Sequence, residues 1–402
     1  MLQTEKRNFK RILFFLFYPL IFLMRVIPRN KNIWIFGNFK GYIDNTKYLY
    51  EYLIGNENNT LEVYWITKDK ILYNNLKANN KSVLYHYSIL GMWKSMRAGV
   101  SFFSNGYSDL NRIAAIDSFT VNLWHGFPIK KLAFDTQIEV AFYSFGKFNK
   151  VMTFLSEKSL QLLHDKIDLH SVSSIYDLKR MSNAFRVIKE KYRITGTPRF
   201  DIINNKINSN SIISNIFFEH NITEGKNIMY APSWREKGWS FNQKLNNPKK
   251  LENYLEKSNS YFFIKRHPLT TEEEILNWGI KESERIRFID SFDINESYQF
   301  IDVLITDFSS LIFDYGILNK PILYFITDLQ EYDTHRGFYD DIFEISNNNI
   351  NEDWNQLIDS LAKTHTQNNY INHKHFDYII KNPINNVRKN IIEIVKKELL
   401  ND

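Results

Sequence analysis

The sequence contains no cysteine among its 402 residues. Disulfide bonds, cysteine-ligated zinc, iron–sulfur clusters and thiol catalysis are therefore excluded for this chain. It also lacks a Gly-x-x-x-x-Gly-Lys-Ser/Thr phosphate loop and a Gly-x-Gly-x-x-Gly fingerprint, which disfavours P-loop ATPases and dinucleotide dehydrogenases. The absence of Asp-x-Asp, His-Glu-x-x-His and Gly-x-Ser-x-Gly weakens metal-dependent transfer, zinc hydrolysis and serine hydrolysis.

What is present is ordinary globular composition, with a net charge of +6 and many aromatic residues, of which 32 are phenylalanine. A positive charge favours an anionic partner: a nucleic acid, a membrane surface or a phosphorylated substrate. Lysine and arginine are spread along the chain and form no stripe, so we expect no nucleic-acid partner.

The N-terminus, residues 1–30, combines basic and apolar segments. Lys6, Arg7, Lys10 and Arg11 precede an apolar run over residues 12–24, which is too short to span a bilayer. No small-residue cleavage site follows, as a signal peptide would require. We expect a helix that lies in the membrane interface. The alternative is a helix packed on the protein's own surface.

From Asn32 onward, short β-branched and aromatic runs alternate with helical patterns, which predicts an α/β fold with two Rossmann-like domains. The expected boundaries are 31–205 and 206–402, on either side of a polar stretch near Asn204 to Asn221. Expected strands of the first domain are Ile33–Phe36, Leu61–Ile66, Val83–Tyr85, Val100–Phe103, Thr120–Leu123, Lys150–Phe154 and Tyr192–Ile194. Those of the second are Asn227–Tyr230, Tyr261–Ile264, Ile286–Phe288, Val303–Ile305 and Ile322–Phe325.

Two such domains that face each other form a cleft lined by the carboxyl ends of both sheets, where α/β proteins bind ligands. The motifs with chemical potential follow expected strands. The first is Trp124-His125-Gly126-Phe127-Pro128-Ile129-Lys130. Gly126 and Pro128 predict a tight turn that holds His125 at the strand end, where a histidine suits a general base. The alternative is a histidine beside an ordinary turn.

Two further motifs place a guanidinium after a strand. Gly196-Thr197-Pro198-Arg199-Phe200-Asp201 closes the first half, and its Arg199 either binds an anion or pairs with Asp201. Tyr230-Ala231-Pro232-Ser233-Trp234-Arg235 follows the first strand of the second half. The planar guanidinium donors of Arg235 suit phosphate.

A cationic cluster follows another expected strand in Lys265-Arg266-His267-Pro268. Lys265, Arg266 and His267 would repel one another unless an anion or the opposite domain neutralises them. His267 is alternatively a capping histidine fixed by Pro268.

The last of these motifs is Thr306-Asp307-Phe308-Ser309-Ser310, in which a hydrophobic strand runs into a helix start. Hydroxyl side chains cap helices there, and the free N–H groups with the helix dipole form an anion site. The alternative is a plain helix cap.

Taken in order, these motifs, together with Asp314 and with Arg336-Gly337-Phe338-Tyr339-x-Asp341, resemble the CDP-glycerol glycerophosphotransferase family of teichoic-acid synthesis. The resemblance spans residues 120–341. It implies a GT-B fold and an enzyme on the cytoplasmic face of the membrane. The implied donor is CDP-glycerol or CDP-ribitol, and the implied acceptor is a lipid-linked saccharide or polyol phosphate.

The resemblance also implies roles for the motif residues. His125 is the base for the acceptor hydroxyl, and His267 stabilises the pyrophosphate or the leaving CMP. Positioning and charge neutralisation supply most of phosphoryl transfer, so no cofactor or metal is obligatory. The other implied donor-binding residues are Arg235, Lys265, Arg266, Thr306, Asp307, Ser309, Ser310 and Asp314. Gly126, Pro128, Lys130, Arg199, Asp201 and Arg336 serve the acceptor or the structure.

One alternative within enzymes stays open at this point. A GT-B glycosyltransferase that uses a nucleotide-sugar for surface polysaccharide would share the fold and the membrane surface. The donor on which it acts would distinguish it from the transferase that the motifs resemble.

Overall fold

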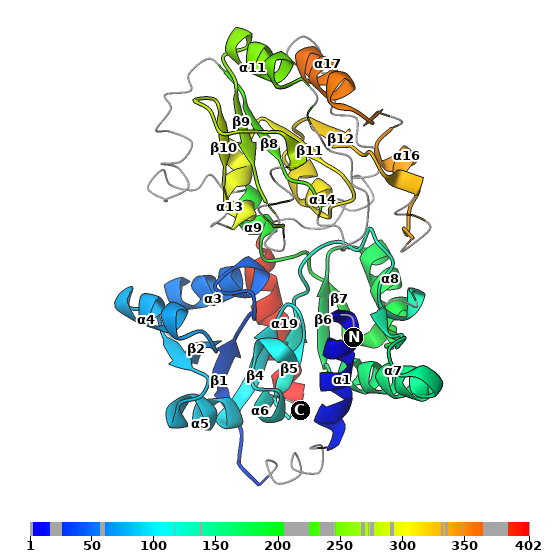
Figure 1. Ribbon diagram of the computed structural model, residues 1–402. Helices are drawn as coiled ribbons and strands as arrows, with labels where there is room; N and C mark the ends of the chain where they lie inside the picture. The colour runs from blue at the N-terminus through cyan, green and yellow to red at the C-terminus, as the bar shows by residue number, and fades with distance from the viewer. Residues whose placement is uncertain are drawn as a thin grey trace. The chain divides into compact units, whose positions relative to one another are not determined.

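The computed structural model describes residues 3–16, 26–56, 61–115, 117–136, 139–204, 225–233, 245, 247–266, 270–271, 273, 277–289, 293–330, 333, 337–347, 349–364 and 385–401. The chain divides into two compact units (Figure 1). The first comprises Met1–Asp201 with Lys381–Asp402, and the second comprises Ile202–Ile380.

The first unit is built on a seven-stranded parallel sheet of order β3-β2-β1-β4-β5-β6-β7. Its central strands are buried on both faces, which explains their runs of apolar and β-branched residues. The strands are β1 (Asn30–Phe36), β2 (Glu62–Thr67), β3 (Val83–Tyr85), β4 (Ala98–Phe103), β5 (Phe119–Asn122), β6 (Leu169–Val172) and β7 (Tyr192–Ile194).

Helices connect these strands, as parallel pairing requires: α3 (Asp44–Asn56), α4 (Lys70–Ala78), α5 (Ile89–Arg97), α6 (Arg112–Ala115), α7 (Asn149–Asp165) and α8 (Ile175–Phe185). Further helices of this unit lie outside the connections, α1 (Gln3–Leu16) before the first strand and the C-terminal α19 (Val387–Asn401). Much of the aromatic excess is explained here, because Trp34, Phe36, Tyr50, Trp65 and Phe102 are fully buried. The rings of Phe36 and Phe102 stack at 4.4 Å between centroids.

The second unit repeats this construction with a six-stranded parallel sheet of order β10-β9-β8-β11-β12-β13. Its strands are β8 (Asn227–Tyr230), β9 (Tyr261–Ile264), β10 (Ile286–Phe288), β11 (Val303–Thr306), β12 (Ile322–Phe325) and β13 (Ile350–Asn351). Its helices are α11 (Pro248–Lys257), α13 (Ile294–Ser297), α14 (Leu311–Gly316), α16 (Ile342–Ile345) and α17 (Trp354–Thr364). The predicted α/β class with two parallel sheets is confirmed.

The last helix departs from the expected domain limits, because α19 belongs to the first unit and not to a second domain over residues 206–402. The division itself falls after Asp201, inside α9 (Phe200–Asn204). The Asp201 carboxylate accepts hydrogen bonds from the backbone N–H groups of Val387 and Arg388 and from Nε of Arg388. A buried carboxylate thus caps α19, and sequence periodicity carries no signal for so distant a contact.

One predicted strand is wrong for a local reason. Lys150–Phe154 lies inside α7, where Val151, Phe154 and Leu155 are exposed at helical spacing. The strand was predicted because this segment contains β-branched and aromatic residues, which are also typical of strands. Conversely, β6 was missed because its sequence, Leu-His-Ser-Val, is short and half polar, although all four residues are buried.

The N-terminal helix α1 packs against the protein through polar contacts. The buried carboxylate of Glu5 accepts from the backbone N–H groups of Tyr143 and Ser144 and from the Ser144 hydroxyl. Asn8 donates to the carbonyl of Glu139. These contacts agree with the alternative in which α1 packs on the protein's own surface. Lys6, Arg7 and Lys10 of the same helix are exposed. No helix in the described part of the chain is long and apolar enough to cross a membrane.

The Asp201 cap generates a prediction about stability. We expect Asp201→Ala to lower the free energy of unfolding by about 2–4 kcal/mol, because it leaves the Arg388 guanidinium and two backbone N–H groups without their acceptor. Urea unfolding would measure this loss. Lys389→Ala, on the exposed face of α19, is the matched control and should change stability by about 0.5 kcal/mol or less. Equal stability of the two variants would show that Asp201 does not anchor α19.

Candidate active site

His125 lies just beyond the carboxyl end of β5, as predicted. The residue before it, Trp124, has a left-handed backbone with φ of 52°, which is uncommon for a residue with a side chain. Asn122 stabilises this conformation, since its side-chain oxygen accepts from the Trp124 N–H at 3.0 Å. The turn was expected to depend on Gly126, but the left-handed residue is Trp124. Such strain beside a histidine marks a candidate functional site.

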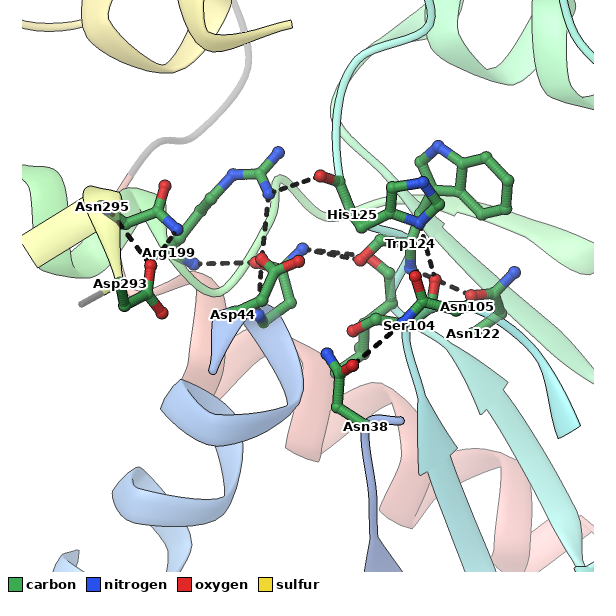
Figure 2. A network of polar contacts seen from close by, with 12 residues as sticks. Asn38, Asp44, Ser104, Asn105, Asn122, Trp124, His125, Arg199, Asp293 and Asn295 are labelled. Atoms are coloured by element: carbon green, nitrogen blue, oxygen red, sulfur yellow. Dashed lines mark hydrogen bonds and ion pairs between the residues drawn. The ribbon is translucent and has the colours of Figure 1, made fainter. Parts of the chain in front are cut away.

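The His125 ring is oriented by a backbone carbonyl. Its Nδ1 lies 3.1 Å from the carbonyl oxygen of Ser104, which follows β4, the neighbour of β5 (Figure 2). A carbonyl oxygen only accepts, so Nδ1 carries the hydrogen and Nε2 keeps a lone pair. The tautomer with a free Nε2 is the one that can accept a proton from a substrate.

The imidazole of His125 is neutral at physiological pH. Removal from water is the largest influence on its pKa, followed by the positive charge of Lys40, while the hydrogen bond to Ser104 acts in the opposite direction. Together they lower the pKa to about 4. The free Nε2 is therefore unprotonated at pH 7, as a general base requires.

Arg199 holds the backbone of this loop. Its Nη1 donates to the carbonyl oxygen of His125 and to Oδ1 of Asp44, at 3.0 Å each. Asp44 begins α3, so Arg199 forms an ion pair with a residue that the sequence did not suggest, where one interpretation had proposed Asp201. Only 2% of the Arg199 surface is exposed. Its guanidinium is therefore a fixed support for the backbone of the His125 loop.

Asn45 adds a second hold on the same segment. Its side-chain amide donates to the carbonyl oxygens of Leu123 and Trp124, and its oxygen accepts from the Arg199 N–H. One buried asparagine thus joins the loops that follow β1, β5 and β7. Asp44, Asn45 and Ser104 were not identified from the sequence. The signal was available, because polar residues follow β1 and β4 at the same carboxyl edge.

The remaining residues of this motif occupy supporting positions. Pro128 is buried, and its carbonyl accepts from Nη1 of Arg180 at 2.9 Å. Gly126 is buried and Lys130 half-buried. The structure thus brings Gly126, Pro128 and His125 into one packed loop, and a role for Lys130 stays a prediction.

In the second unit, the Thr306–Ser310 segment follows the central strand β11. Thr306 donates to the carbonyl of Ala231 at 2.7 Å, and the carboxylate of Asp307 accepts from the N–H of Ser233 at 3.0 and 3.1 Å. Both side chains therefore hold the turn after β8. These contacts indicate that Thr306 and Asp307 organise the candidate donor site.

The two serines of this segment precede α14. Ser310 is the N-cap residue and makes no side-chain capping hydrogen bond, whereas Ser309 Oγ accepts from the Leu311 N–H at 3.4 Å. The helix has only six residues, which makes its dipole short. Asp314 is buried within α14. Phe308 packs on Phe338 at 5.0 Å between ring centroids, so two motifs that are distant in sequence meet.

The cationic pair Lys265 and Arg266 follows β9, the neighbour of β8 in the same sheet. Burial lowers the pKa of Lys265, and the negative charge of Asp293 acts to raise it. The sequence predicted that an anion or the opposite domain neutralises this cluster, and Asp293 at the start of α13 supplies a negative charge from within the same unit. The Arg266 guanidinium lies over the Phe288 ring at 5.6 Å.

Three predicted residues, Arg235, His267 and Arg336, lie outside the described residues. Their roles therefore remain predictions. What the structure does place together in the second unit is the trio of loops after β9, β8 and β11, three adjacent strands with a common carboxyl edge.

Comparison with known proteins identifies the family. The sequence model of the CDP-glycerol:poly(glycerophosphate) glycerophosphotransferases matches residues 18–381. The chain belongs to this family. It is 30% identical over 361 residues to a teichoic acid poly(glycerol phosphate) polymerase of Bacillus spizizenii, covering 86% of this chain and 87% of that protein. It is 28% identical over 377 residues to a teichoic acid glycerol-phosphate transferase of Staphylococcus aureus, covering 91% of this chain and 92% of that protein.

The fold is also shared with a solved structure. The wall teichoic acid polymerase TagF matches with a TM-score of 0.73 at 21% sequence identity, over 100% of this chain and 99% of that one. The predicted family is thus confirmed, and the chain is an enzyme of the glycerophosphotransferase class. The His125 loop and the Thr306–Ser310 segment both lie within the matched residues of this family member.

Proposed function

We propose that this chain transfers glycerol phosphate from CDP-glycerol to a hydroxyl group of a lipid-linked acceptor or growing teichoic-acid polymer. The observation that carries the proposal is the neutral His125, whose Nδ1 is engaged by Ser104 and whose Nε2 is left to accept a proton. Family membership supplies the donor class. CDP-ribitol is the alternative donor.

The proposed reaction needs one base, His125. The acceptor hydroxyl oxygen attacks the β-phosphorus of the donor, and its proton passes to Nε2 of His125. The bond between the β-phosphorus and the oxygen bridging to the α-phosphate breaks, and CMP departs with the electron pair of that bond. A positioned base typically accelerates such a step by about 10²–10⁴-fold.

The donor half of the site is assigned to the second unit. The half-buried Ser309 and Ser310 supply hydroxyl and backbone N–H donors, and Lys265 and Arg266 supply positive charge at the same sheet edge. Charge neutralisation of this kind is the main requirement of phosphoryl transfer. Arg235 and His267 are proposed to complete this set.

We propose that the two units form a fold of the GT-B class. Support comes from the placement of candidate residues at the carboxyl edge of each sheet, since α/β proteins bind ligands there.

We also propose that the enzyme binds the membrane surface on its cytoplasmic side, through the α7 face, defined as Phe148, Val151, Phe154, Leu155 and Leu162. These side chains are between 40% and 68% exposed, and Lys147, Lys150 and Lys158 surround them. The adjoining α1 adds exposed Lys6, Arg7 and Lys10. An apolar face with a basic rim suits an anionic lipid surface, which is where a lipid-linked acceptor would be found.

The catalytic proposal predicts the effect of removing the base. His125→Ala should lower the rate of CMP release by about 10²–10⁴-fold and leave CDP-glycerol binding intact, because the donor residues lie on the second unit. His86→Ala is the matched control. It removes a half-buried histidine that follows the edge strand β3 of the same sheet, and its activity should stay within about threefold.

The same assay distinguishes the donors. CDP-glycerol, CDP-ribitol and a panel of nucleotide-sugars are offered separately with one lipid-linked acceptor, and products are identified by mass spectrometry. We expect polyol-phosphate transfer with release of CMP. Sugar transfer from a nucleotide-sugar, or a folded His125→Ala variant with normal turnover, would refute the proposal.

The membrane proposal predicts weaker vesicle binding when the α7 face becomes polar. Phe154→Ser combined with Leu155→Ser should reduce partitioning onto phosphatidylglycerol vesicles by about tenfold or more, since each buried apolar side chain contributes about 1.5–3 kcal/mol. Phe343→Ser, an exposed phenylalanine on α16, is the control. Sedimentation with vesicles measures the bound fraction, and equal binding by all variants would exclude the α7 face.

A further inference from the structure

A buried carboxylate stands behind the hydrogen bond that orients His125. Asp109 lies in the loop after β4 and is 4% exposed. Its Oδ2 accepts from the backbone N–H groups of Ser104 and Asn105, at 2.9 and 2.8 Å. The carbonyl of Ser104 is the group that binds Nδ1 of His125. Asp109 and His125 are thus connected through a single residue.

The same carboxylate also holds the loop after β1. Its Oδ1 accepts from the backbone N–H of Phe39 at 3.2 Å. Asn38 reinforces this link, because its side-chain oxygen accepts from the Asn105 side chain (Figure 2). The same oxygen accepts from the Lys40 N–H. The two loops on either side of Asp109 therefore have a common anchor, and one of them carries Lys40, whose charge acts on His125.

Burial of the charged Asp109 carboxylate costs free energy, which its hydrogen bonds offset. Burial raises the pKa of its carboxyl group, and the backbone N–H groups of Asn105, Ser104 and Phe39 act against that effect by stabilising the charged form. Buried carboxylates with several backbone donors fix loop geometry firmly, because each charge-assisted bond is stronger than a neutral one. Gly37, at the end of β1, has no room for a Cβ, which would approach the Asp109 carbonyl oxygen to 2.6 Å.

We propose that Asp109 is a positioning residue for the transfer reaction, which fixes the His125 imidazole through the peptide of Ser104 and sets the Lys40 loop beside it. The inference rests on the proposed role of His125 as the base. Asp109 itself does not touch the substrate. It limits the rotation of the His125 ring by holding rigid the carbonyl to which the ring is bound.

The central test is a double-mutant cycle on full-length enzyme with CDP-glycerol and a lipid-linked acceptor. Asp109→Asn keeps the shape but replaces one acceptor oxygen with a donor, so it cannot bind all the N–H groups. We expect kcat to fall about 10–100-fold, as for other residues that orient a catalytic group, with KM for the donor unchanged within about threefold. In a His125→Ala background the same substitution should cost less than about threefold, because its effect passes through the imidazole.

A matched control separates positioning from general support of the sheet. Asp168 binds the backbone N–H and the hydroxyl of Thr120 near the start of β5, the strand that leads to His125. Asp168→Asn therefore removes a similar carboxylate contact at the opposite end of that strand. Its kcat should stay within about threefold of wild type.

A second variant covers the case in which Asp109→Asn does not fold. Asn105→Ala removes the amide that donates to Asn38 and to Asp109, and it should lower kcat about 3–10-fold with the same dependence on His125. Equal losses in the wild-type and His125→Ala backgrounds, or no loss at all, would overturn the positioning role. Normal turnover by His125→Ala itself would instead refute the proposed base, so the two failures are distinguishable.

Discussion

The hydrogen bond between Nδ1 of His125 and the carbonyl of Ser104 is the interaction on which the proposed chemistry depends. It decides which nitrogen carries the proton, and therefore which nitrogen is free to take one from a substrate. A backbone carbonyl serves this purpose well only when the backbone itself is fixed. Asp109 holds the loop after β4 that carries Ser104, and Asn45 and Arg199 hold the backbone of the His125 loop from the segments after β1 and β7.

The parallel sheet makes this convergence possible. Every strand of the first sheet ends at the same edge, so loops that are far apart in sequence meet there. Asp44 and Arg199 are 155 positions apart and form an ion pair at 3.0 Å. In the second sheet the loops after β8, β9 and β11 likewise meet at one edge. There Thr306 and Asp307 bind the turn at Ala231 and Ser233.

The sequence predicted the architecture well because strand periodicity and loop motifs are local signals. The α/β class and the position of His125 after β5 follow from short runs of residues. Contacts between distant segments were beyond such reasoning. The pairing of Asp201 with Arg388 in α19, and of Arg199 with Asp44, depends on which loops the topology brings together. Lys150–Phe154 was misread because exposed apolar residues on α7 imitate a strand.

The tautomer and charge of His125 are open to direct measurement by long-range ¹H–¹⁵N correlation spectra of histidine-labelled enzyme, with the resonances assigned by comparison with His125→Gln. A histidine whose folded pKa is lowered to about 4 stays neutral as the pH falls from 8 to 5.5. We predict a neutral ring with hydrogen on Nδ1 and a bare Nε2 over this whole range. A ring protonated on Nε2, or one that titrates near pH 6.5, would contradict the role of His125 as the base.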